Sequence, residues 1–408
     1  MIKRKLFNQL IKDLKSEYFI IITGARQTGK TTLLKQLQKY LAEKNQAVYF
    51  INLEDPDYLT LLDEHPKNLL SFFPLPKNKK AIFLIDEIQY LQKPTTFLKY
   101  IYDEYRDRVK LFVSGSSAFY LDAKFKDSLA GRKKIYILNT LSLEEFLLFK
   151  GKDDLAKLVA KIPYHNLNLA SFPLALKREL MQETNFYMTY GGYPRVTLAE
   201  SEEEKQEILL DLVNSFVKKD ILESGIKNEQ KVLNLLKIMA SQCGGLVNIN
   251  NLSNLLRVSH TAVENYFYAL RKSFLLYFIH PFSQNVRNEI KKMPKAYFAD
   301  LGLRNMLLKD FRPLPLKQDR GEIYENFIFR QFLDRLPVDD IKFWRHQQGA
   351  EVDFILHESL ACEVKYSMEL INLPKYRRFR ELYPQIPLKF IFHEGTKPES
   401  QPDDYWQF

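Results

Sequence analysis

The sequence predicts an α/β protein whose N-terminal part is a parallel β-sheet covered by helices on both faces. Short, continuous apolar runs alternate there with helical segments, a pattern typical of parallel strands that are buried on both sides. The 408 residues are 46 % hydrophobic and 13 % aromatic, so the chain can bury substantial cores. Its length corresponds to two to four domains.

The order of elements changes along the chain. We expect a helix at 4–15, another at 94–106, and a mostly helical region at 142–222 that YGGYPRV interrupts. From about residue 321 we expect helix, strand, strand, helix and strand. The expected N-terminal strands cover residues 17–23, 47–54, 80–91, 109–117 and 131–138.

Composition excludes several classes of protein. Lys and Arg outnumber Asp and Glu by 60 to 50, and this net charge of +10 is compatible with an acidic partner such as nucleic acid. Two cysteines, Cys243 and Cys362, form neither a disulfide framework nor a cysteine zinc site. No secretory signal is recognisable, and no apolar run reaches the ~18–20 residues of a membrane span. We therefore expect a cytoplasmic protein without a membrane partner.

A phosphate-binding motif follows the first expected strand. GARQTGKT at 24–31 fits G-x-x-x-x-G-K-[ST] and opens the next helix, which is the context that the motif requires. Gly24 and Gly29 let the backbone N–H groups turn toward a phosphate, and the helix N-terminus favours its negative charge. Lys30 would reach the β- and γ-phosphates of ATP, and Thr31 would bind Mg²⁺.

Two carboxylates end the third expected strand, FLIDE. Asp86 would hold Mg²⁺, and Glu87 would activate the attacking water, which favours hydrolysis over transfer to a small molecule. Ser114, which ends the next strand, would either sense the γ-phosphate or simply form a serine-rich turn. The expected catalytic residues are Glu87, Lys30 and Ser114. The expected ATP-binding residues are Gly24, Ala25, Arg26, Gln27, Thr28, Gly29, Lys30, Thr31, Thr32 and Asp86.

Two arginines are candidates for stabilising charge in the transition state. Arg132 lies in LAGRKK and Arg195 in GGYPR. Each could equally be a surface or structural residue.

The segments GARQTGKTT, FLIDEIQ, VSGSS, LAGR followed by LSLEEF, and YGGYPR occur in this order. Together they resemble a family of prokaryotic AAA-superfamily ATPases of the archaeal type, whose C-terminal region has an uncertain function. The resemblance covers essentially the whole chain. It implies a sheet with a strand inserted between the strand before the phosphate loop and the strand that ends in Asp-Glu. Whether the protein forms a homo-oligomer or binds a protein partner stays open.

The middle of the chain resembles a winged helix. A helix at 229–243 is ended by Gly244 and Gly245, and 248–258 precedes a longer helix that Ser259 would cap. That longer helix would bind in the major groove of DNA. Alternatively, the module only connects domains, since the aromatic residues of this helix are typical of packing. The expected DNA-facing residues are His260, Thr261, Glu264, Asn265 and Arg271. Strands at 274–282 and 295–300 would frame a wing that carries Arg287, Lys291, Lys292 and Lys295.

The C-terminal part carries a second group of acidic residues. Asp353 and Glu363 lie on two expected strands, at 350–356 and 360–367, and Lys365 shares a strand face with Glu363. The spacing D-x₉-E-x-K resembles the restriction-endonuclease-like fold, with Glu325 on the preceding helix. Asp353 and Glu363 would bind Mg²⁺ with Lys365 and Glu325 nearby, or the group is a salt-bridged strand pair. A basic segment could follow DNA phosphates or be a solvated face; it contains Lys375, Arg377, Arg378 and Arg380.

The sequence therefore predicts a P-loop NTPase parallel-sheet domain, a helical and winged-helix domain, and a small α/β endonuclease-like domain. The expected boundaries are 1–222, 223–310 and 311–408. The leading hypothesis is an AAA-type ATPase that acts with double-stranded DNA through its C-terminal half. The alternatives are an ATP-gated, Mg²⁺-dependent DNA nuclease and a nucleotide switch that binds a protein partner.

Overall fold

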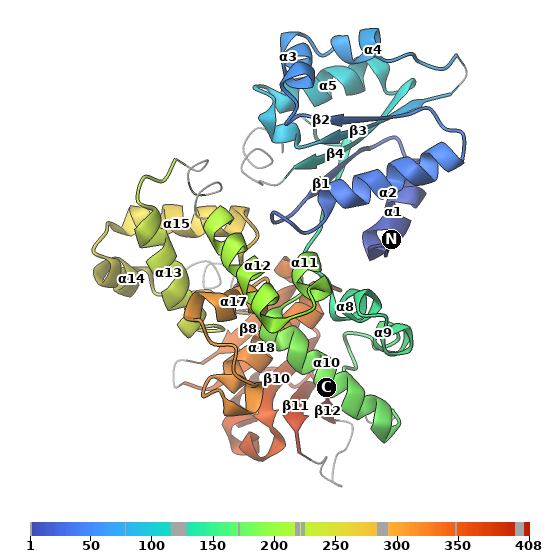
Figure 1. Cartoon of the computed structure of the whole chain (residues 1–408). Coiled ribbons are helices and arrows are strands. Elements are labelled where there is room, and N and C mark those ends of the chain that lie inside the picture. The colour runs from blue at the N-terminus through green and yellow to red at the C-terminus, as the bar shows by residue number, and fades with distance from the viewer. Residues whose placement is uncertain are drawn as a thin grey trace. The chain divides into compact units, whose positions relative to one another are not determined.

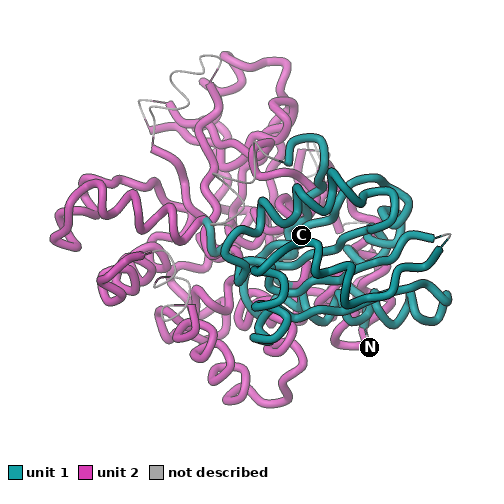
Figure 2. The backbone as a smooth tube through the Cα atoms, turned by 90° about the horizontal axis from the view of Figure 1, so that it is seen from above, with its two compact units in different colours: residues 1–140, 272–274 teal, residues 141–271, 275–408 magenta. Residues whose placement is uncertain are grey.

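The computed structural model describes residues 2–77, 79–115, 129–169, 172–216, 221, 225–283, 293–346, 349–395 and 404–408. The chain forms two compact units (Figure 2). Unit 1 comprises residues 1–140 and 272–274, and unit 2 comprises 141–271 and 275–408. In the described part of the chain, no helix is long and apolar enough to cross a membrane.

Unit 1 is built on a five-stranded parallel sheet in the order β2-β3-β4-β1-β5. The strands are β1 (Phe19–Thr23), β2 (Val48–Asn52), β3 (Ala81–Asp86), β4 (Val109–Gly115) and β5 (Lys133–Ile137). The expected parallel sheet is confirmed, and β4 lies between β1 and β3 as the family resemblance implies. The expected strand 80–91 is too long, because Glu87 turns the chain with φ +57° and the 3₁₀ helix η1 (Ile88–Tyr90) follows.

Helices cover both faces of this sheet (Figure 1). Because side chains alternate along a strand, Ile20 and Ile22 of β1 pack in one core with α1 and α2, whereas Phe19 and Ile21 pack in the other. The helices of the first face are α1 (Lys5–Asp13) and α2 (Lys30–Glu43), and those of the second are α3 (Pro56–Glu64), α4 (Asn68–Phe72) and α5 (Pro94–Tyr105).

Unit 2 begins with helices, as expected. They are α8 (Leu143–Phe149), α9 (Asp153–Ala160), α10 (Leu174–Tyr190), α11 (Pro194–Leu198) and α12 (Glu202–Ser215). The signature LSLEEF forms a capping box, in which the Ser142 hydroxyl accepts from the Glu145 N–H at 3.2 Å and the Glu145 carboxylate accepts from the Ser142 N–H at 3.0 Å. Such a reciprocal pair fixes where α8 begins.

The glycines of YGGYPR have a packing role within unit 2. A Cβ atom on Gly191 would lie 2.0 Å from a carboxylate oxygen of Asp300, and one on Gly192 would lie 2.5 Å from the Leu141 carbonyl. The Gly192 N–H donates to Asp300 at 2.7 Å, and the same carboxylate caps α17 (Leu301–Leu308) by accepting from Leu303. This signature therefore allows the chain to pass close to the start of α17.

The middle segment contains the three expected helices and a small antiparallel ladder. The helices are α13 (Glu229–Ser241), α14 (Ile249–Leu256) and α15 (His260–Lys272), and strands β6 (Leu276–Ile279) and β7 (Lys295–Phe298) pair with each other. The Ser259 hydroxyl accepts from the Ala262 N–H at 3.1 Å, which confirms the expected cap.

A second five-stranded sheet has the order β12-β11-β10-β9-β8. β8–β9 and β9–β10 are antiparallel, whereas β10–β11 and β11–β12 are parallel. The sequence pattern did not predict β8 or β12, so the expected order of elements in this region was incomplete. The elements are α18 (Arg320–Leu333), β8 (Ile341–Arg345), β9 (Glu351–Leu356), β10 (Leu360–Ser367), α19 (Arg377–Leu382), β11 (Leu388–Glu394) and β12 (Tyr405–Gln407), joined by 3₁₀ turns at Leu314–Leu316, Val338–Asp340, Met368–Leu370 and Leu373–Tyr376.

Candidate functional sites

The phosphate loop lies at the carboxyl end of β1 and leads into α2. Gly24 has φ +147°, and a Cβ there would lie 2.2 Å from the Leu138 carbonyl oxygen, so only glycine fits. Gly29 has φ +95° and precedes α2, whose first turn carries no acidic residue. The first N–H groups of this helix therefore form a favourable place for a phosphate.

Lys30 is buried and folded onto the loop. Its Nζ donates to the carbonyls of Gly24 at 2.9 Å and Ala25 at 2.8 Å, and the Thr28 hydroxyl donates to Ala25 at 2.9 Å. These contacts fix the loop around the ammonium. Of the other expected ATP-binding residues, Arg26 and Thr31 are half-buried, and Gln27 and Thr32 are exposed.

Asp86, Ser114 and Glu87 meet at the same edge of the sheet. The Ser114 hydroxyl donates to the Asp86 carboxylate and accepts from the Glu87 N–H at 3.2 Å. Asp86 also interacts with the Thr31 hydroxyl. Burial raises the pKa of Asp86, opposed by these two hydroxyls, and the Glu87 charge adds to the rise. Hydroxyl and carboxylate oxygens are suitable Mg²⁺ ligands, so Thr31 and Asp86 fit the ion.

Glu87 is held in an uncommon backbone conformation. Its φ of +57° is left-handed, and the Gln89 amide donates to its carboxylate. Non-glycine residues in this conformation cost free energy and concentrate at functional sites. Gln89 was not among the expected site residues, because nothing in its sequence context distinguishes it.

Arg4 is a second residue that the sequence did not reveal. Its guanidinium donates to the Thr28 carbonyl of the phosphate loop at 2.7 Å and to the Asn139 carbonyl at 2.8 Å. The side chain is buried, although Arg4 was expected only to start an amphipathic helix. It links the loop to the segment that follows β5.

The two arginine candidates lie in different places. Arg132 forms a 3.0 Å ion pair with Asp103 of α5. The β1–β5 register joins Phe19 to Lys133 and Thr23 to Ile137, so Arg132 lies at the opposite strand end from the loop, ~13 Å away by strand rise. In this position Arg132 lies away from the phosphate loop of its own chain, and its expected role in stabilising charge stays a prediction. Arg195 is exposed at the start of α11 in unit 2.

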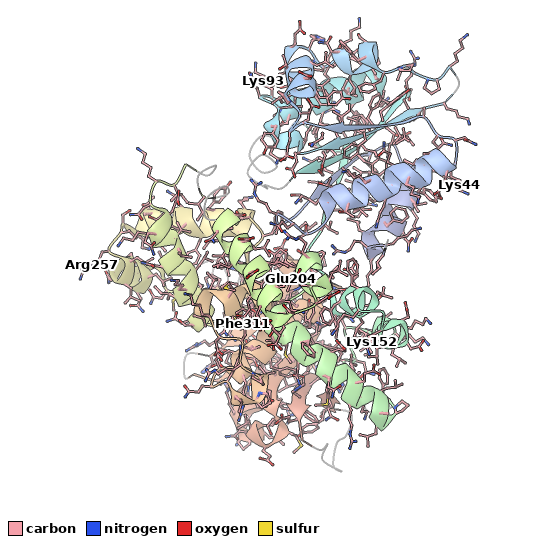
Figure 3. All side chains as sticks on the ribbon, viewed as in Figure 1. Lys44, Lys93, Lys152, Glu204, Arg257 and Phe311 are labelled. Carbon is pink, nitrogen blue, oxygen red and sulfur yellow. The ribbon has the colours of Figure 1, made fainter. Side chains whose placement is uncertain are left out.

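The expected DNA-facing residues of α15 are all exposed, whereas Tyr266 and Phe267 are buried in the core. Arg257, which ends α14, is also exposed (Figure 3). Of the expected wing residues, Arg287, Lys291 and Lys292 lie outside the described residues. The residues of α15 that face away from the core are His260, Thr261, Glu264, Asn265 and Arg271.

Lys295 is not a wing residue, and this expectation is corrected. Its side chain is 4 % exposed and its Nζ lies 3.0 Å from Glu325, 2.7 Å from Glu351 and 3.4 Å from Asp353. The β7 backbone turns this side chain inward, and the Tyr297 hydroxyl, two residues on, also donates to Glu325 at 2.6 Å. The neighbouring carboxylates hold the pKa of Lys295 well above its usual value despite burial.

The structure brings together all four C-terminal residues that the sequence grouped. The Asp353 carboxylate accepts from the Val364 N–H at 2.9 Å, and Lys365 pairs with Glu363 and lies 3.7 Å from Asp353. Burial raises the pKa of Glu325 and of Glu363 to about 7 in each case. The pKa of Asp353 is lowered: burial raises it, but Lys295 and Lys365 together outweigh that effect.

One end of the basic segment reaches this group. Tyr376 donates to Glu363 at 2.6 Å, and Lys375 lies 3.7 Å from the same carboxylate. Arg377 and Arg378 pair with Glu381 on the surface of α19, and Arg380 is exposed. The segment is therefore divided between the acidic group and the exposed face of α19.

The expected Mg²⁺ ligands of this C-terminal group do not surround a metal position. Among the residues that the structure describes, no group of three or more His, Cys, Asp or Glu side chains is arranged to hold a metal ion. The carboxylates are directed at lysine nitrogens instead. As they stand, these residues do not fit the divalent cation that the endonuclease-like pattern implies.

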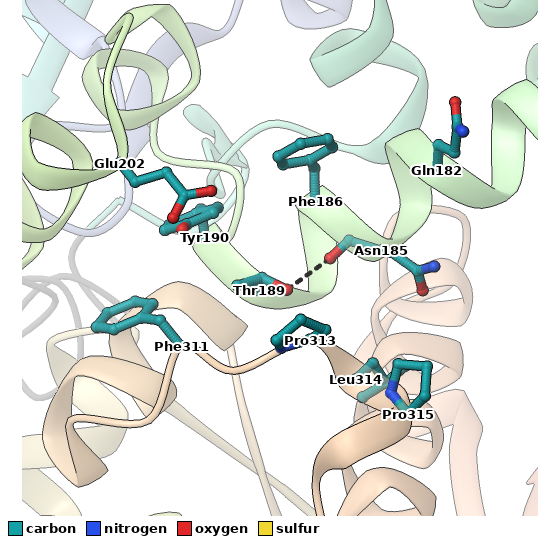
Figure 4. A pocket seen from close by; sticks show the side chains of 10 residues that line it. All are labelled: Gln182, Asn185, Phe186, Thr189, Tyr190, Glu202, Phe311, Pro313, Leu314 and Pro315. Carbon is teal, nitrogen blue, oxygen red and sulfur yellow. Dashed lines mark hydrogen bonds between the residues drawn. The ribbon is translucent and has the colours of Figure 1, made fainter.

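A cavity of about 460 Å³ lies elsewhere in unit 2, between α10 and the segment 311–315 (Figure 4). The Tyr190 ring stacks on Phe311 at 5.5 Å, and Phe186 stacks on Tyr190 at 6.4 Å. Among the described residues that line it, Glu202 is the one carboxylate, and none is a lysine, arginine or histidine. This lining is suited to apolar contacts more than to catalysis.

Comparisons with known proteins match three parts of the chain. Residues 16–147 match the family model "AAA domain", and residues 181–313 and 320–408 match two families described as domains of unknown function, DUF8612 and DUF4143. Unit 1 therefore contains an AAA-type P-loop domain.

Two relatives extend over most of the chain. An uncharacterised protein of Haemophilus influenzae is 27 % identical over 423 residues, covering 97 % of this chain and 95 % of that protein. An uncharacterised protein of Methanocaldococcus jannaschii is 27 % identical over 368 residues, covering 88 % of this chain and 77 % of that protein.

Solved structures are similar at low identity. The Aeropyrum pernix Orc1 protein in complex with DNA has a TM-score of 0.30 and 12 % identity, covering 74 % of this chain and 91 % of that chain. Replication initiator DnaA bound to AMPPCP and single-stranded DNA has a TM-score of 0.30 and 16 % identity, covering 65 % and 86 %.

Proposed function

We propose that this protein binds and hydrolyses ATP with Mg²⁺ and that nucleotide state controls how its C-terminal half engages double-stranded DNA. The observation that carries the ATPase proposal is the group at the carboxyl edge of the first sheet. There Asp86 contacts both Thr31 and Ser114, and Glu87 is attached to the same serine through its backbone.

Each residue has a distinct part in the proposed reaction. The loop N–H groups and Lys30 would hold the phosphates, and Thr31 and Asp86 would hold the ion, which would supply positive charge to the phosphates. Glu87 accepts a proton from the attacking water, and Ser114 positions Glu87 relative to Asp86. ATP would offer Lys30 phosphate oxygens in place of the two loop carbonyls that it now contacts.

Two substitutions separate binding from turnover. Lys30→Ala should abolish binding of a fluorescent ATP analogue, because the loop loses its ammonium. Glu87→Gln should keep binding and lower phosphate release by about 10²- to 10⁴-fold, the usual worth of a general base. The matched controls are Lys39→Ala on the exposed side of α2 and Glu104→Gln on α5, both of which should behave as the parent protein. Parental turnover in Glu87→Gln would contradict the assigned base.

The DNA part of the proposal is supported by the exposed polar row of α15, by Arg257 and by the arginines of α19. These residues would contact phosphates more than bases, so binding should weaken steeply with salt. The test measures ATP turnover and a gel shift with duplex DNA at 50 and 200 mM salt. Arg257→Ala combined with Arg271→Ala should weaken the shift, and Lys237→Ala on α13 serves as a control. No shift and no stimulation at either salt concentration would refute it.

A nucleotide switch that binds a protein partner is the second candidate. It is favoured by the apolar cavity beside α10, where Phe186 is 43 % exposed. Two results together would favour this candidate over the first. ATP turnover should be slow and not stimulated by DNA. The Phe186→Ser variant should keep the parental turnover but lose association with a protein partner.

A further inference from the structure

Three carboxylates from two elements converge on one nitrogen atom. The Nζ of Lys295 lies within 3.4 Å of Glu325 on α18 and of Glu351 and Asp353 on β9. Glu351 and Asp353 are two residues apart and therefore share one face of β9. These two carboxylates reach Nζ from β9, and the Glu325 carboxylate reaches it from α18.

This point needs a positive charge. Carboxylates that face one another without a cation repel strongly in a buried setting, and a buried ammonium is equally costly without partners. Each charge thus stabilises the others. The Phe343 ring, 5.7 Å from Nζ, adds a favourable cation–π contact.

The three distances from Nζ to the carboxylates are those of an ammonium with its hydrogen-bond acceptors. Nitrogen-to-oxygen separations of 2.7–3.4 Å are close to ordinary hydrogen bonds. A divalent ion at this place would lie against the fixed charge of Lys295.

The backbone holds Lys295 in position from both sides. The Val247 N–H donates to the Pro294 carbonyl at 2.8 Å, the Ala296 N–H donates to Gly245 at 3.2 Å, and Leu246 forms a β-bridge with Lys295. On its other edge, β7 pairs with β6, which joins Lys295 to Ile279. The ammonium is therefore presented by a fixed strand and not by a surface loop.

We propose that the Lys295 ammonium takes the place of a divalent cation in this cluster, so that the parent protein binds no metal there. Removing the ammonium exposes a divalent-cation site formed by Glu325, Glu351 and Asp353. The inference does not depend on the ATPase proposal, because every residue involved lies in unit 2.

The test counts bound Mn²⁺ by electron paramagnetic resonance in the nucleotide-free full-length chain. Lys295→Met should bind one more ion than the parent protein, and Lys295→Arg, which keeps a cation, should bind the parental number. Adding Asp353→Asn to Lys295→Met should remove the extra ion. Metal bound at the unit 1 site is common to all these proteins and cancels in the comparison.

Two results would overturn the proposal. One is a folded Lys295→Met protein, judged by circular dichroism, that gains no ion. The other is a single Asp353→Asn variant of the parent that binds one ion fewer, since the parent cluster would then hold metal. The comparison of Asp353→Asn with the parent does not require Lys295→Met to fold. Equal numbers of bound ions in these two proteins support the proposal.

Discussion

Gly24 and Gly29 belong to one motif but meet different physical demands. A Cβ on Gly24 would collide with the Leu138 backbone, whereas one on Gly29 would have no heavy atom within 4 Å. Both residues have positive φ. Gly24 is therefore restricted by space as well as by conformation, and Gly29 by conformation alone.

Replacing each with alanine should separate the two effects. Gly24→Ala should destabilise unit 1 by about 3 kcal/mol or more, because strain and overpacking add. Gly29→Ala should cost about 1–2 kcal/mol, the price of the left-handed conformation. Denaturant unfolding followed in the two variants checks the order, and a larger loss for Gly29→Ala would contradict it.

Residues in contiguous motifs could be predicted, and residues that act across the fold could not. The positions of Lys30, Asp86 and Ser114 follow from short patterns at strand ends. Lys295 lies 30 residues from Glu325 and 58 from Asp353 in the sequence, and its neighbours gave no sign of which way β7 would face. A lysine beside other basic residues therefore resembles a residue of a surface wing.

At the level of elements, two helix caps offer a matched comparison. Ser142 caps α8 in a buried capping box, and Ser201 caps α12 at the surface by accepting from the Glu204 N–H at 3.1 Å. Ser142→Ala should cost about 1–2 kcal/mol and Ser201→Ala about 0.5 kcal/mol, since water can replace the exposed cap. Thermal unfolding of both variants checks this, and equal losses would speak against the role of burial.

Strand β11 carries a titrating group in its core. Burial lowers the pKa of His393 below its usual 6.5, opposed by the Phe408 carbonyl 3.3 Å away and by the Glu394 charge, and the ring packs between Tyr324 and Tyr366. The folded state thus prefers the neutral ring. This preference contributes stability above pH 6.5 that is lost as the pH falls through the lowered folded-state value.

Unit 2 should accordingly unfold at lower temperature as the pH is reduced below 6.5. His393→Gln cannot be protonated, so its melting temperature should decline less over the same interval, even if it starts lower. His165→Gln, a change at an exposed histidine, is the control. Parallel pH curves for His393→Gln and the parent would exclude this histidine as a cause.

The elements of the first sheet were predictable because their apolar runs are long and buried on both faces. β8 and β12 were missed for a physical reason: IKFWR mixes charged and aromatic residues, and YWQ is three residues long. Each strand is defined by its pairing partner, β9 or β11, and not by its own composition.

At the scale of the whole molecule, the division into two units predicts selective stabilisation by nucleotide. A ligand that binds only the folded phosphate site at 100 times its dissociation constant adds ~2.7 kcal/mol. ATP analogue and Mg²⁺ should therefore raise the unfolding temperature of unit 1. Phe327→Ala, in the buried core of unit 2, should cost about 3–5 kcal/mol in that unit without changing the ligand-induced shift.

Differential scanning calorimetry of the parent, Phe327→Ala and Lys30→Ala tests this expectation. The Lys30→Ala protein should show no shift with the ligand. Phe327→Ala should lower the unfolding temperature of unit 2. If the ligand raised that temperature as much as it raises the unfolding temperature of unit 1, the assignment of the ligand to unit 1 would be contradicted. The three-part division expected from the sequence remains a prediction that proteolysis near residues 222 and 310 can examine.

The sheet order of unit 1 also has a consequence for synthesis. β1 pairs with β4 and β5, so its first partner begins 86 residues after β1 ends and its second ends at Ile137. A growing chain exposes the apolar segment FIIIT until both neighbours have emerged, and such unpaired strands promote aggregation. Ribosome-bound fragments that end before residue 109 should therefore depend on chaperones, and those that extend well past 137 should not.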